Sequence, residues 1–551
     1  MSQTSKHSVI VVGAGPVGLT VAMDLASRGV SVLVLERRPR GEPPSVKCNH
    51  VSARSMEIFR RLGVAAAVRA AGLPDEYPHD VAYRTSTTGI ELTRISIPGR
   101  AGRLRQDPGP DTGWPTIEPP HRINQIYLEP ILFEHAASME NVTIINRVEV
   151  VEVTQDDGGV VVQARELASG KTVHHAADFL VGCDGGRSLV RGAIGAKLQG
   201  DAVIQRVQSS YIRAPKLLDM FQHPPAWATF SLNPVRCGNV YAIDGKELWL
   251  VHNYLKDDEP DFESVDRDRS IRQILGVDDR FEYELISKED WYGRRLVADR
   301  FRDRRIFICG DAAHLWVPYA GYGMNAGIAD AANLAWLLAA AVKGWADQRI
   351  LDAYECERHP ITSQVSYFVM DHAHAMATER RIVPSGIEDT GEAGEAIRRE
   401  VGQRAYELNV QQYCCAGLNF GYYYDASPLI AYDGETQPAY TMGSFTPSTV
   451  PGCRTPHFVL SDGRSLYDAM GPDYALLRTK DDIDPQPLLE AAQRRGVPIK
   501  LLDLSGEALP DAYRHALLIS RPDQHVAWRG DVLPTDPAAL IERLRGGRID
   551  A

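Results

Sequence analysis

The sequence predicts an α/β protein of several domains: a parallel sheet between helices, an inserted β-sheet domain, and a small α/β domain at the C-terminus. Three observations predict this fold class. Residues 8–36 are typical of a strand, a tight turn, a helix and a second strand, and both strands are apolar without alternation, as buried parallel strands are. Residues from about 200 to 292 are strand-like and rich in aromatic side chains. After about residue 440, strand and helix patterns alternate again.

Composition narrows the classes of function. A chain of 551 residues predicts two to four domains. The net charge of −12 argues against nucleic acid or an anionic membrane surface as the main partner. No segment resembles a secretory signal, and the later apolar run NLAWLLAAAVKGW is too short to span a bilayer. Eight cysteines without a CxxC pattern indicate reduced thiols, and hence a cytoplasmic location.

The first motif is VVGAGPVG, which follows a strand and opens a helix. Gly13 makes the turn, Gly15 lets the backbone approach a pyrophosphate, and Gly18 lets helix and strand pack closely. The pyrophosphate then meets the N–H groups at the helix start. Glu36, at the end of the next strand, can accept hydrogen bonds from ribose hydroxyls and would repel a 2′-phosphate. The motif therefore predicts FAD or NAD rather than NADP.

The middle of the chain alternates loops, one helix and strands. Residues 97–122 are rich in Pro, Gly and Arg and are expected to form a loop. The helix QIYLEPILFEHAAS follows, with a break or kink expected near Pro130. Residues 144–182 are typical of a β-meander with turns at DDGG and SGK.

Two later motifs end strands in the same way. In FLVGCDGGRSLVRGAIG (179–195), Asp184 follows a strand, and an ordinary turn with an acid that caps a helix would give the same pattern. In the second, the strand RRIFIC delivers Gly310 and Asp311 at its carboxyl end, where ligands of open α/β sheets bind. Asp311 is a candidate to bind a ribitol hydroxyl, unless it merely caps a helix.

The turn 321–325 (GYGMN) presents backbone N–H groups at a helix start and suits a delocalised anion. Helices are expected to dominate from 325 to about 420.

The three motifs, in this order, resemble those of the class A flavoprotein monooxygenases. These are single-component FAD-dependent aromatic hydroxylases similar to phenol, 3-(3-hydroxyphenyl)propionate and p-hydroxybenzoate hydroxylases. The stretches NHVSARSMEIFRRLG (49–63) and LDAYECERHP (351–360) resemble two further family helices, and the C-terminal part resembles the thioredoxin-like tail of the longer members. The resemblance implies a Rossmann-like FAD-binding domain of glutathione-reductase type in two parts (1–195 and 293–435), a substrate-binding sheet (196–292) and a thioredoxin-like domain (440–551).

The resemblance also assigns residues to FAD. The ADP half would be held by the glycine turn and Glu36, the ribitol by Asp311, and the isoalloxazine would face the 321–325 turn. The full set of expected cofactor-binding residues is Gly13, Gly15, Pro16, Val17, Gly18, Glu36, Arg37, Arg54, Gln125, Asp184, Gly310, Asp311, Gly321, Gly323, Met324 and Asn325. Arg54 could instead pair with an acid on a helix surface, and Gln125 could be an exposed helix-start residue. No metal site is expected.

The activity implied by the resemblance is hydroxylation of a phenolic or related small aromatic substrate with O2 and NADPH or NADH, through a flavin C4a-hydroperoxide. His252, Tyr241, Tyr322 and Pro318 are the candidate catalytic residues. His252 is preferred as the substrate base because an imidazole titrates near neutral pH, although Tyr211, Tyr241, His252 and Tyr254 could each be packed core residues. Tyr322 stands where many members have Gln, and the tail lacks CxxC, so a redox role for Cys453 is not expected. His314 is expected to support its loop by hydrogen bonding.

Three alternatives remain at this point. The chain could be a polyketide-tailoring hydroxylase, a Baeyer–Villiger oxygenase, or, in a different class, a non-catalytic FAD-binding scaffold. Members with this tail are often homodimers, so a homodimer is expected.

Overall fold

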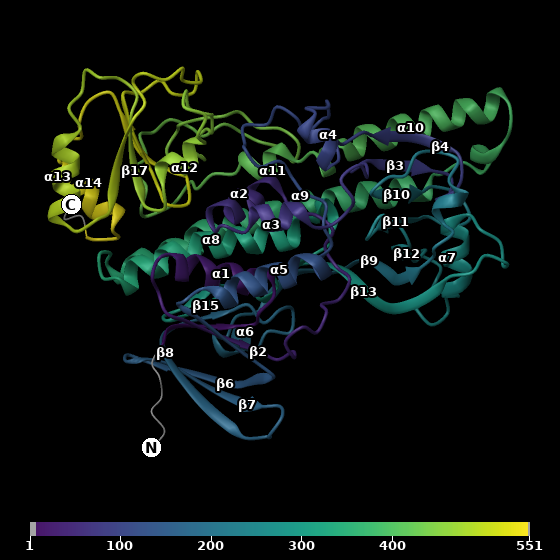
Figure 1. Ribbon diagram of the computed structural model, residues 1–551, viewed down its shortest axis with the longest axis horizontal. Coiled ribbons are helices and arrows are strands. Elements are labelled where there is room, and N and C mark those ends of the chain that lie inside the picture. The colour runs from purple at the N-terminus through teal and green to yellow at the C-terminus, as the bar shows by residue number, and fades with distance from the viewer. Residues whose placement is uncertain (1–6, 549–551) are drawn as a thin grey trace.

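A computed structural model describes residues 7–548 of the chain (Figure 1). It contains three sheets with helices between and around them, which confirms the predicted α/β class. Figure 1 shows the second sheet (β9 to β13) and the C-terminal sheet (β17) at opposite ends of the long axis, with the first sheet and helix α8 between them. The predicted limits at residues 1 and 551 lie outside the described residues, and the limits of the four segments stay a prediction.

The first sheet brings the three motifs together. Strands β15, β8, β1, β2 and β5 run parallel in that order, so their carboxyl ends share one edge. Gly182 of β8 pairs with both Val12 of β1 and Ile308 of β15, and each of these strands ends where a motif begins. The strands are β1 (His7–Val12), β2 (Val32–Glu36), β5 (Val142–Asn146), β6 (Val148–Asp156), β7 (Gly159–Glu166), β8 (Thr172–Gly182), β14 (Arg302–Asp303) and β15 (Ile306–Ile308).

The second sheet takes strands from three parts of the chain. Its order is β16-β13-β9-β12-β11-β10-β3-β4. The aromatic-rich segment predicted from the sequence supplies its centre, while two strands come from before residue 195 and one from the stretch after Asp311. These strands are β3 (Val81–Arg84), β4 (Glu91–Ile95), β9 (Leu198–Arg213), β10 (Ala228–Ser231), β11 (Gly238–Ala242), β12 (Leu248–Tyr254), β13 (Glu284–Ala298) and β16 (His314–Trp316).

The C-terminal sheet is small and mixed. Its order is β18-β17-β19-β20, with β17 and β18 parallel and the other neighbours antiparallel. The elements are α12 (Leu466–Met470), β17 (Tyr474–Arg478), α13 (Gln486–Arg494), β18 (Ile499–Asp503), β19 (Leu517–Ser520), β20 (Val526–Gly530) and α14 (Pro537–Leu544).

Helices cover the first two sheets and join them. Helix α9 contacts β9, β13 and β16, and α10 contacts β4. The helices before the C-terminal domain are α1 (Pro16–Ser27), α2 (Ala53–Arg61), α3 (Ala65–Ala70), α4 (Arg100–Leu104), α5 (Gln125–Ser138), α6 (Leu189–Ala193), α7 (Arg267–Leu275), α8 (Tyr322–Val342), α9 (Asp352–Arg381), α10 (Glu392–Tyr413) and α11 (Ala416–Phe420). The 3-10 turns are η1 (Leu218–Met220), η2 (Gly310–Ala312), η3 (Tyr319–Gly321), η4 (Gln348–Leu351) and η5 (Ser385–Glu388).

Helix α8 is the central core helix. It packs against α1, where a Cβ added to Gly327 would lie 2.6 Å from Cγ2 of Val17, so a glycine is needed for this close approach. Among the described residues it is the one helix long and apolar enough to cross a membrane, yet 89% of its apolar window is buried inside the protein. The apolar run NLAWLLAAAVKGW, expected to be too short for a bilayer, overlaps only the C-terminal half of this helix, which begins at Tyr322.

Candidate functional site

The glycine turn after β1 is shaped by close backbone contacts. Gly13 has φ +102°, and a Cβ there would lie 2.4 Å from the carbonyl oxygen of Cys183. A Cβ on Gly18 would lie 2.0 Å from the carbonyl oxygen of Gly13. A Cβ on Gly15, in contrast, would meet no atom of the described residues within 4 Å. Open space therefore lies in front of the start of helix α1.

Glu36 closes one side of this turn. Its carboxylate accepts hydrogen bonds from the backbone N–H of Ala14 at 2.6 Å and from the N–H of Arg38 at 2.8 Å. The side chain of Arg37 is 74% exposed and lies 3.6 Å from Glu149, so it is directed into solvent. The predicted contact of Arg37 with FAD stays a prediction.

Asp184 has an internal capping role. Its Oδ1 accepts from the hydroxyl of Ser188 at 2.5 Å, and its Oδ2 from the backbone N–H of Val190 at 3.1 Å. Ser188 is the N-cap of the short helix α6. Both carboxylate oxygens are thus engaged by the protein, beside Gly13, and a role toward FAD remains a prediction.

Asp311 is exposed to solvent, yet neighbouring protein surrounds it closely enough for desolvation to raise the pKa of its carboxyl, against smaller opposing effects of His314 and Lys47. We call this partly enclosed position the recess at Asp311. Gly310 before it has φ +59°. His314, as expected, supports the loop: Nε2 lies 2.7 Å from Oδ2 of the buried Asp330. An accessible carboxylate inside a recess is the arrangement that a polar ligand group needs.

The start of helix α8 is fixed by Asn325. Its side-chain oxygen accepts from the backbone N–H of Ser52 at 2.8 Å, and its amide donates to the carbonyl of His50 at 3.1 Å and that of Gly321 at 2.6 Å. Gly321 has φ +59°, and a Cβ there would lie 3.0 Å from Cβ of His50. Residues 323 and 324 form the first turn of α8, so the segment 50–52 is held against that turn.

The starts of α1 and α8 together fit the two halves of FAD. Within the described residues, no side chain caps either helix start, which leaves backbone N–H groups available to an anion. The open space before Gly15 suits a pyrophosphate, and the recess at Asp311 suits a polyol. The residues present therefore fit the cofactor that the sequence predicts.

Gln125 and Arg54 have different surroundings. The backbone N–H of Gln125 donates to the carbonyl of Cys48 at 3.0 Å, which places the start of α5 beside the segment that leads to His50. The guanidinium of Arg54 points toward the C-terminal domain, where it donates to the carbonyl of Asp523 at 2.8 Å and to the side chain of Gln524. Its predicted contact with FAD stays a prediction.

Two of the candidate catalytic residues meet on the second sheet. The rings of Tyr241 (β11) and His252 (β12) lie 5.6 Å apart, edge to face, and the ring of Trp291 lies 6.0 Å from His252. Burial lowers the pKa of His252 to about 4 and raises that of Tyr241. The reason given for His252, titration near neutral pH, is therefore wrong, because this pKa lies well below neutrality. Catalytic roles for His252 and Tyr241 stay predictions.

The other two candidates lie on either side of the turn η3, and Tyr322 is the first residue of α8. Pro318 is exposed and precedes η3. Tyr322 is buried, and its hydroxyl donates to the carbonyl of Leu418 in α11. The phenol of Tyr322 is thus occupied by the protein, and catalytic roles for both residues stay predictions.

His50 and Arg122 were not singled out from the sequence. Both are buried, and Nη1 of Arg122 donates to Nδ1 of His50, directly behind Gly321. No local pattern marks them, because the 50–52 segment, the loop before α5 and the start of α8 meet only in the folded chain.

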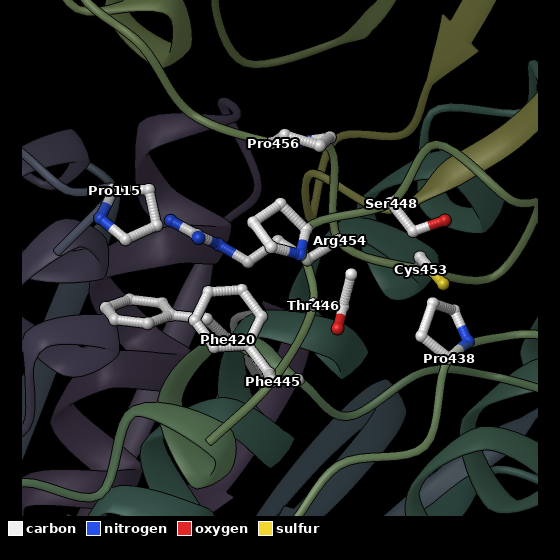
Figure 2. Close-up of a pocket in the computed structure, with 11 residues that line it drawn as sticks. Pro115, Phe420, Pro438, Phe445, Thr446, Ser448, Cys453, Arg454 and Pro456 are labelled. Atoms are coloured by element: carbon white, nitrogen blue, oxygen red, sulfur yellow. The ribbon is translucent and has the colours of Figure 1, made fainter. Parts of the chain in front are cut away.

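A small cavity lies at the junction with the C-terminal domain (Figure 2). Its volume of about 10 Å³ suits roughly one water molecule rather than an aromatic compound. Arg454 crosses it with its guanidinium 4.5 Å from the ring of Phe420, and Nη2 lies 2.6 Å from Oε1 of Glu57. The lining residues are Pro115, Phe420, Gly421, Pro438, Phe445, Thr446, Pro447, Ser448, Cys453, Arg454 and Pro456. This cavity is not the substrate site.

Comparison with known proteins identifies the family. Residues 6–369 match the FAD binding domain family, and residues 448–546 match the family described as aromatic-ring hydroxylase, C-terminal. The chain is 28% identical to phenol 2-monooxygenase of Pseudomonas sp. (strain EST1001), over 98% of this chain and 92% of that protein. It is 30% identical to aklavinone 12-hydroxylase RdmE of Streptomyces purpurascens, over 97% of each.

A solved structure shows the same fold. The rebeccamycin biosynthetic enzyme RebC with reduced flavin superposes with a TM-score of 0.88 at 30% identity, covering 99% of this chain and 100% of that one. The predicted fold class and the predicted resemblance are confirmed. The glycine turn, the recess at Asp311 and these matches together show that the chain belongs to the FAD binding domain family and is an FAD-dependent monooxygenase of the class A aromatic hydroxylases.

Proposed function

We propose that this monooxygenase hydroxylates a phenolic or related aromatic compound, with O2 and NADPH or NADH as cosubstrates. One observation carries the proposal. Between Ile308 and Trp316 the chain leaves the first sheet, passes the recess at Asp311 and enters the second sheet as β16, which pairs with β13. Residues 309–313 thereby connect the first sheet, past Asp311, to the edge strand of the second sheet. The next strand, β13, carries Trp291, whose ring lies 6.0 Å from that of His252.

Each part of the recess has a distinct role toward FAD. The glycine turn and the start of α1 would hold the pyrophosphate, Glu36 the ribose, and Asp311 the ribitol. The start of α8 presents N–H groups that favour negative charge on the bound ring. When bound, FAD supplies the activation of O2 with electrons from NAD(P)H.

The second sheet would orient the substrate. The ring of Tyr241 lies 5.2 Å from that of Trp227, so the face offers aromatic walls to a flat compound. The neutral imidazole of His252 can accept a hydrogen bond from a substrate hydroxyl. Trp227 is buried and Tyr241 and His252 are partly buried, so this face limits the access of water, which would otherwise discharge activated oxygen without hydroxylation.

A polyketide is the second candidate substrate, because aklavinone 12-hydroxylase RdmE is among the relatives that match almost end to end. Baeyer–Villiger oxygenation of such a compound belongs to this alternative. The homodimer and the cytoplasmic location expected from the sequence are part of the proposal as well.

The test is substrate-stimulated oxidation. The purified protein is expected to be yellow, to release FAD on denaturation, and to oxidise NADPH or NADH slowly until a substrate is added. A panel of phenols, hydroxybenzoates, nitrocatechols, hydroxypyridines and polyketide aromatics would be scored for faster oxidation and for product mass gain from labelled O2. Insertion beside a carbonyl would identify the Baeyer–Villiger alternative. If no compound raises the oxidation rate above that of free flavin, the scaffold alternative replaces this proposal.

A further inference from the structure

Arg122 is a buried charge without a carboxylate partner. Arg122 is 2% exposed, and within residues 7–548 its guanidinium forms no ion pair. It donates to Nδ1 of His50 and to the carbonyl oxygen of Tyr413 at 3.4 Å, and it has more N–H donors than these two acceptors can take. Because a buried ion that lacks a counter-ion is costly, such a residue calls for an explanation.

The neighbouring groups do not neutralise it. Asp111, the acid that acts most strongly on Arg122, lies 2.6 Å from Arg103 and is paired with that residue. Burial is the largest effect that lowers the pKa of His50 and His79, and the charge of Arg122 lowers both further, so the imidazoles beside it are neutral. The region thus keeps one uncompensated positive charge.

Arg122 lies at the edge of the aromatic face of the second sheet. Its guanidinium carbon is 4.2 Å from the ring centre of Trp227, and the Trp227 ring is 5.2 Å from that of Tyr241. The charge of Arg122 also acts on the phenol of Tyr241. A cation stacked on the wall of the substrate face is placed to attract an anion there.

Polar atoms beside this wall are also poorly satisfied. The hydroxyls of Tyr83 and Tyr413 and both amide atoms of Asn239 are buried and make no hydrogen bond of ordinary distance and angle in the described part of the chain, although Tyr83 lies near Tyr413, and Tyr241 lies near Asn239 and Tyr413. Rings link these residues: Tyr83 stacks on Phe230 at 5.0 Å, and Phe230 lies 6.3 Å from Tyr413. Unpartnered buried donors and acceptors in an aromatic setting are typical of a binding site.

We propose that Arg122 is the anion-recognition residue of the substrate site, and that the substrate is an aromatic compound carrying an anionic oxygen, either a carboxylate or a phenolate. The anion would take the donors of Arg122 that the protein leaves free, and the ring would lie against Trp227 and Tyr241. This inference rests on the proposed function and specifies its substrate class.

The test compares acids with neutral analogues on the holoenzyme. Binding is followed by the change in flavin absorbance on titration with 3-hydroxybenzoate against 3-hydroxybenzamide, and with 3-hydroxy-2-naphthoate against its amide. A second arm compares 4-cyanophenol, ionised at high pH, with its methyl ether, so that carboxylate and phenolate are separated. At least one acid should bind roughly tenfold or more tightly than its neutral analogue, since hydrogen bonds to charged groups are strong.

Variants assign the preference to one residue. R122M should reduce the ratio to about threefold or less in the fraction of protein that retains FAD, and R122K should retain part of the preference if R122M does not fold. Arg380 is the matched control, because it is also an arginine on an aromatic ring, 4.1 Å from that of Tyr254, and R380M should keep the wild-type ratio.

The outcomes separate this inference from the proposed function. Equal binding of every acid and its neutral analogue would overturn the inference, as would loss of the preference in R380M but not in R122M. If only neutral aromatics stimulate NAD(P)H oxidation, the proposed hydroxylase function stands and anion recognition by Arg122 is overturned. If acids bind preferentially but no compound stimulates oxidation, Arg122 still recognises an anion and the proposed hydroxylase function is overturned.

Discussion

Burial sets the protonation state of four histidines, among them His252 on the second sheet. It lowers the pKa of His252 to about 4 and that of His121 to about 3, and His50 and His79 are shifted in the same direction. At neutral pH these imidazoles are uncharged, so they can hydrogen bond to a substrate hydroxyl but add no positive charge. The charge in this region resides on arginine.

Acid should therefore destabilise the protein through these residues. For His252 the folded state has the lower pKa, so below pH 6.5 the unfolded chain binds a proton that the folded chain does not. Stability is then lost as the pH falls from 6.5 toward 4, by up to roughly 3 kcal/mol for this residue. Urea unfolding across this range should show a smaller loss in H252F than in the wild type. H174Q, at an exposed position on β8, should match the wild type, and equal losses in all three proteins would contradict the assignment.

Asp311 is the residue on which FAD retention should depend most directly. D311A removes the accessible carboxylate from its recess and should weaken FAD binding by roughly tenfold or more, the effect of losing a charge-assisted hydrogen bond. Flavin-to-protein ratios after gel filtration and titration of the apoprotein measure this. The urea midpoint of the apoprotein should be nearly unchanged. D303A, on the neighbouring strand β14, should retain flavin; equal losses in both variants would count against the assigned role.

At the scale of one element, helix α8 offers an internal comparison between its two ends. Gly321 before the helix and Gly344 after it both have positive φ, +59° and +74°. A Cβ on Gly321 would lie 3.0 Å from Cβ of His50, whereas one on Gly344 would meet nothing within 4 Å among the described residues. An alanine at either position would adopt a strained positive φ, but only the alanine at position 321 would also press against His50.

G321A should consequently cost more than G344A. Each substitution should destabilise by about 1 kcal/mol through backbone strain, and G321A by about 1 kcal/mol more through overpacking against His50. Only G321A should also reduce flavin content, since it displaces the turn that we propose to face the flavin ring. Urea denaturation and flavin ratios of both variants decide this. Equal stability and equal flavin content would show that the His50 contact is unimportant.

How far the sequence predicted these elements depends on the range of the interactions. The glycine turn, the β-meander and the position of Asp311 follow from local patterns, because turn geometry and strand ends are set by neighbouring residues. The recruitment of β3 and β4 to the second sheet, and the contact of Arg54 with Asp523, depend on residues more than a hundred positions apart. The burial that lowers the pKa of His252 is likewise a property of the folded chain, so the local sequence around His252 could not predict it.

At the scale of the whole molecule, buried ion pairs fasten the C-terminal domain to the rest. Glu57 of α2 lies 3.1 Å from Arg54 and 2.6 Å from Arg454. Glu357 of α9 lies 2.5 Å from Arg521, whose other nitrogen lies 2.8 Å from Asp523. Arg521, with a smaller effect of His525, holds the pKa of Asp523 well below its usual range despite desolvation. The domain is therefore docked by charges that are stable only while each keeps its partner.

Removing Arg521 should loosen this docking. R521M leaves the carboxylates of Glu357 and Asp523 buried without their shared cation, and breaking such a pair costs about 3–5 kcal/mol. R478M, on β17 of the same domain, removes a more exposed pair with Asp503 and should cost at most about 1 kcal/mol. Urea unfolding measures the difference, and limited proteolysis should cut R521M in the segment between α11 and α12 under conditions where R478M stays intact. Because the proposed FAD site lies on the first sheet and the start of α8, R521M protein that remains folded should keep its flavin. Flavin loss in step with proteolysis would instead mean that the C-terminal domain also holds the cofactor site together.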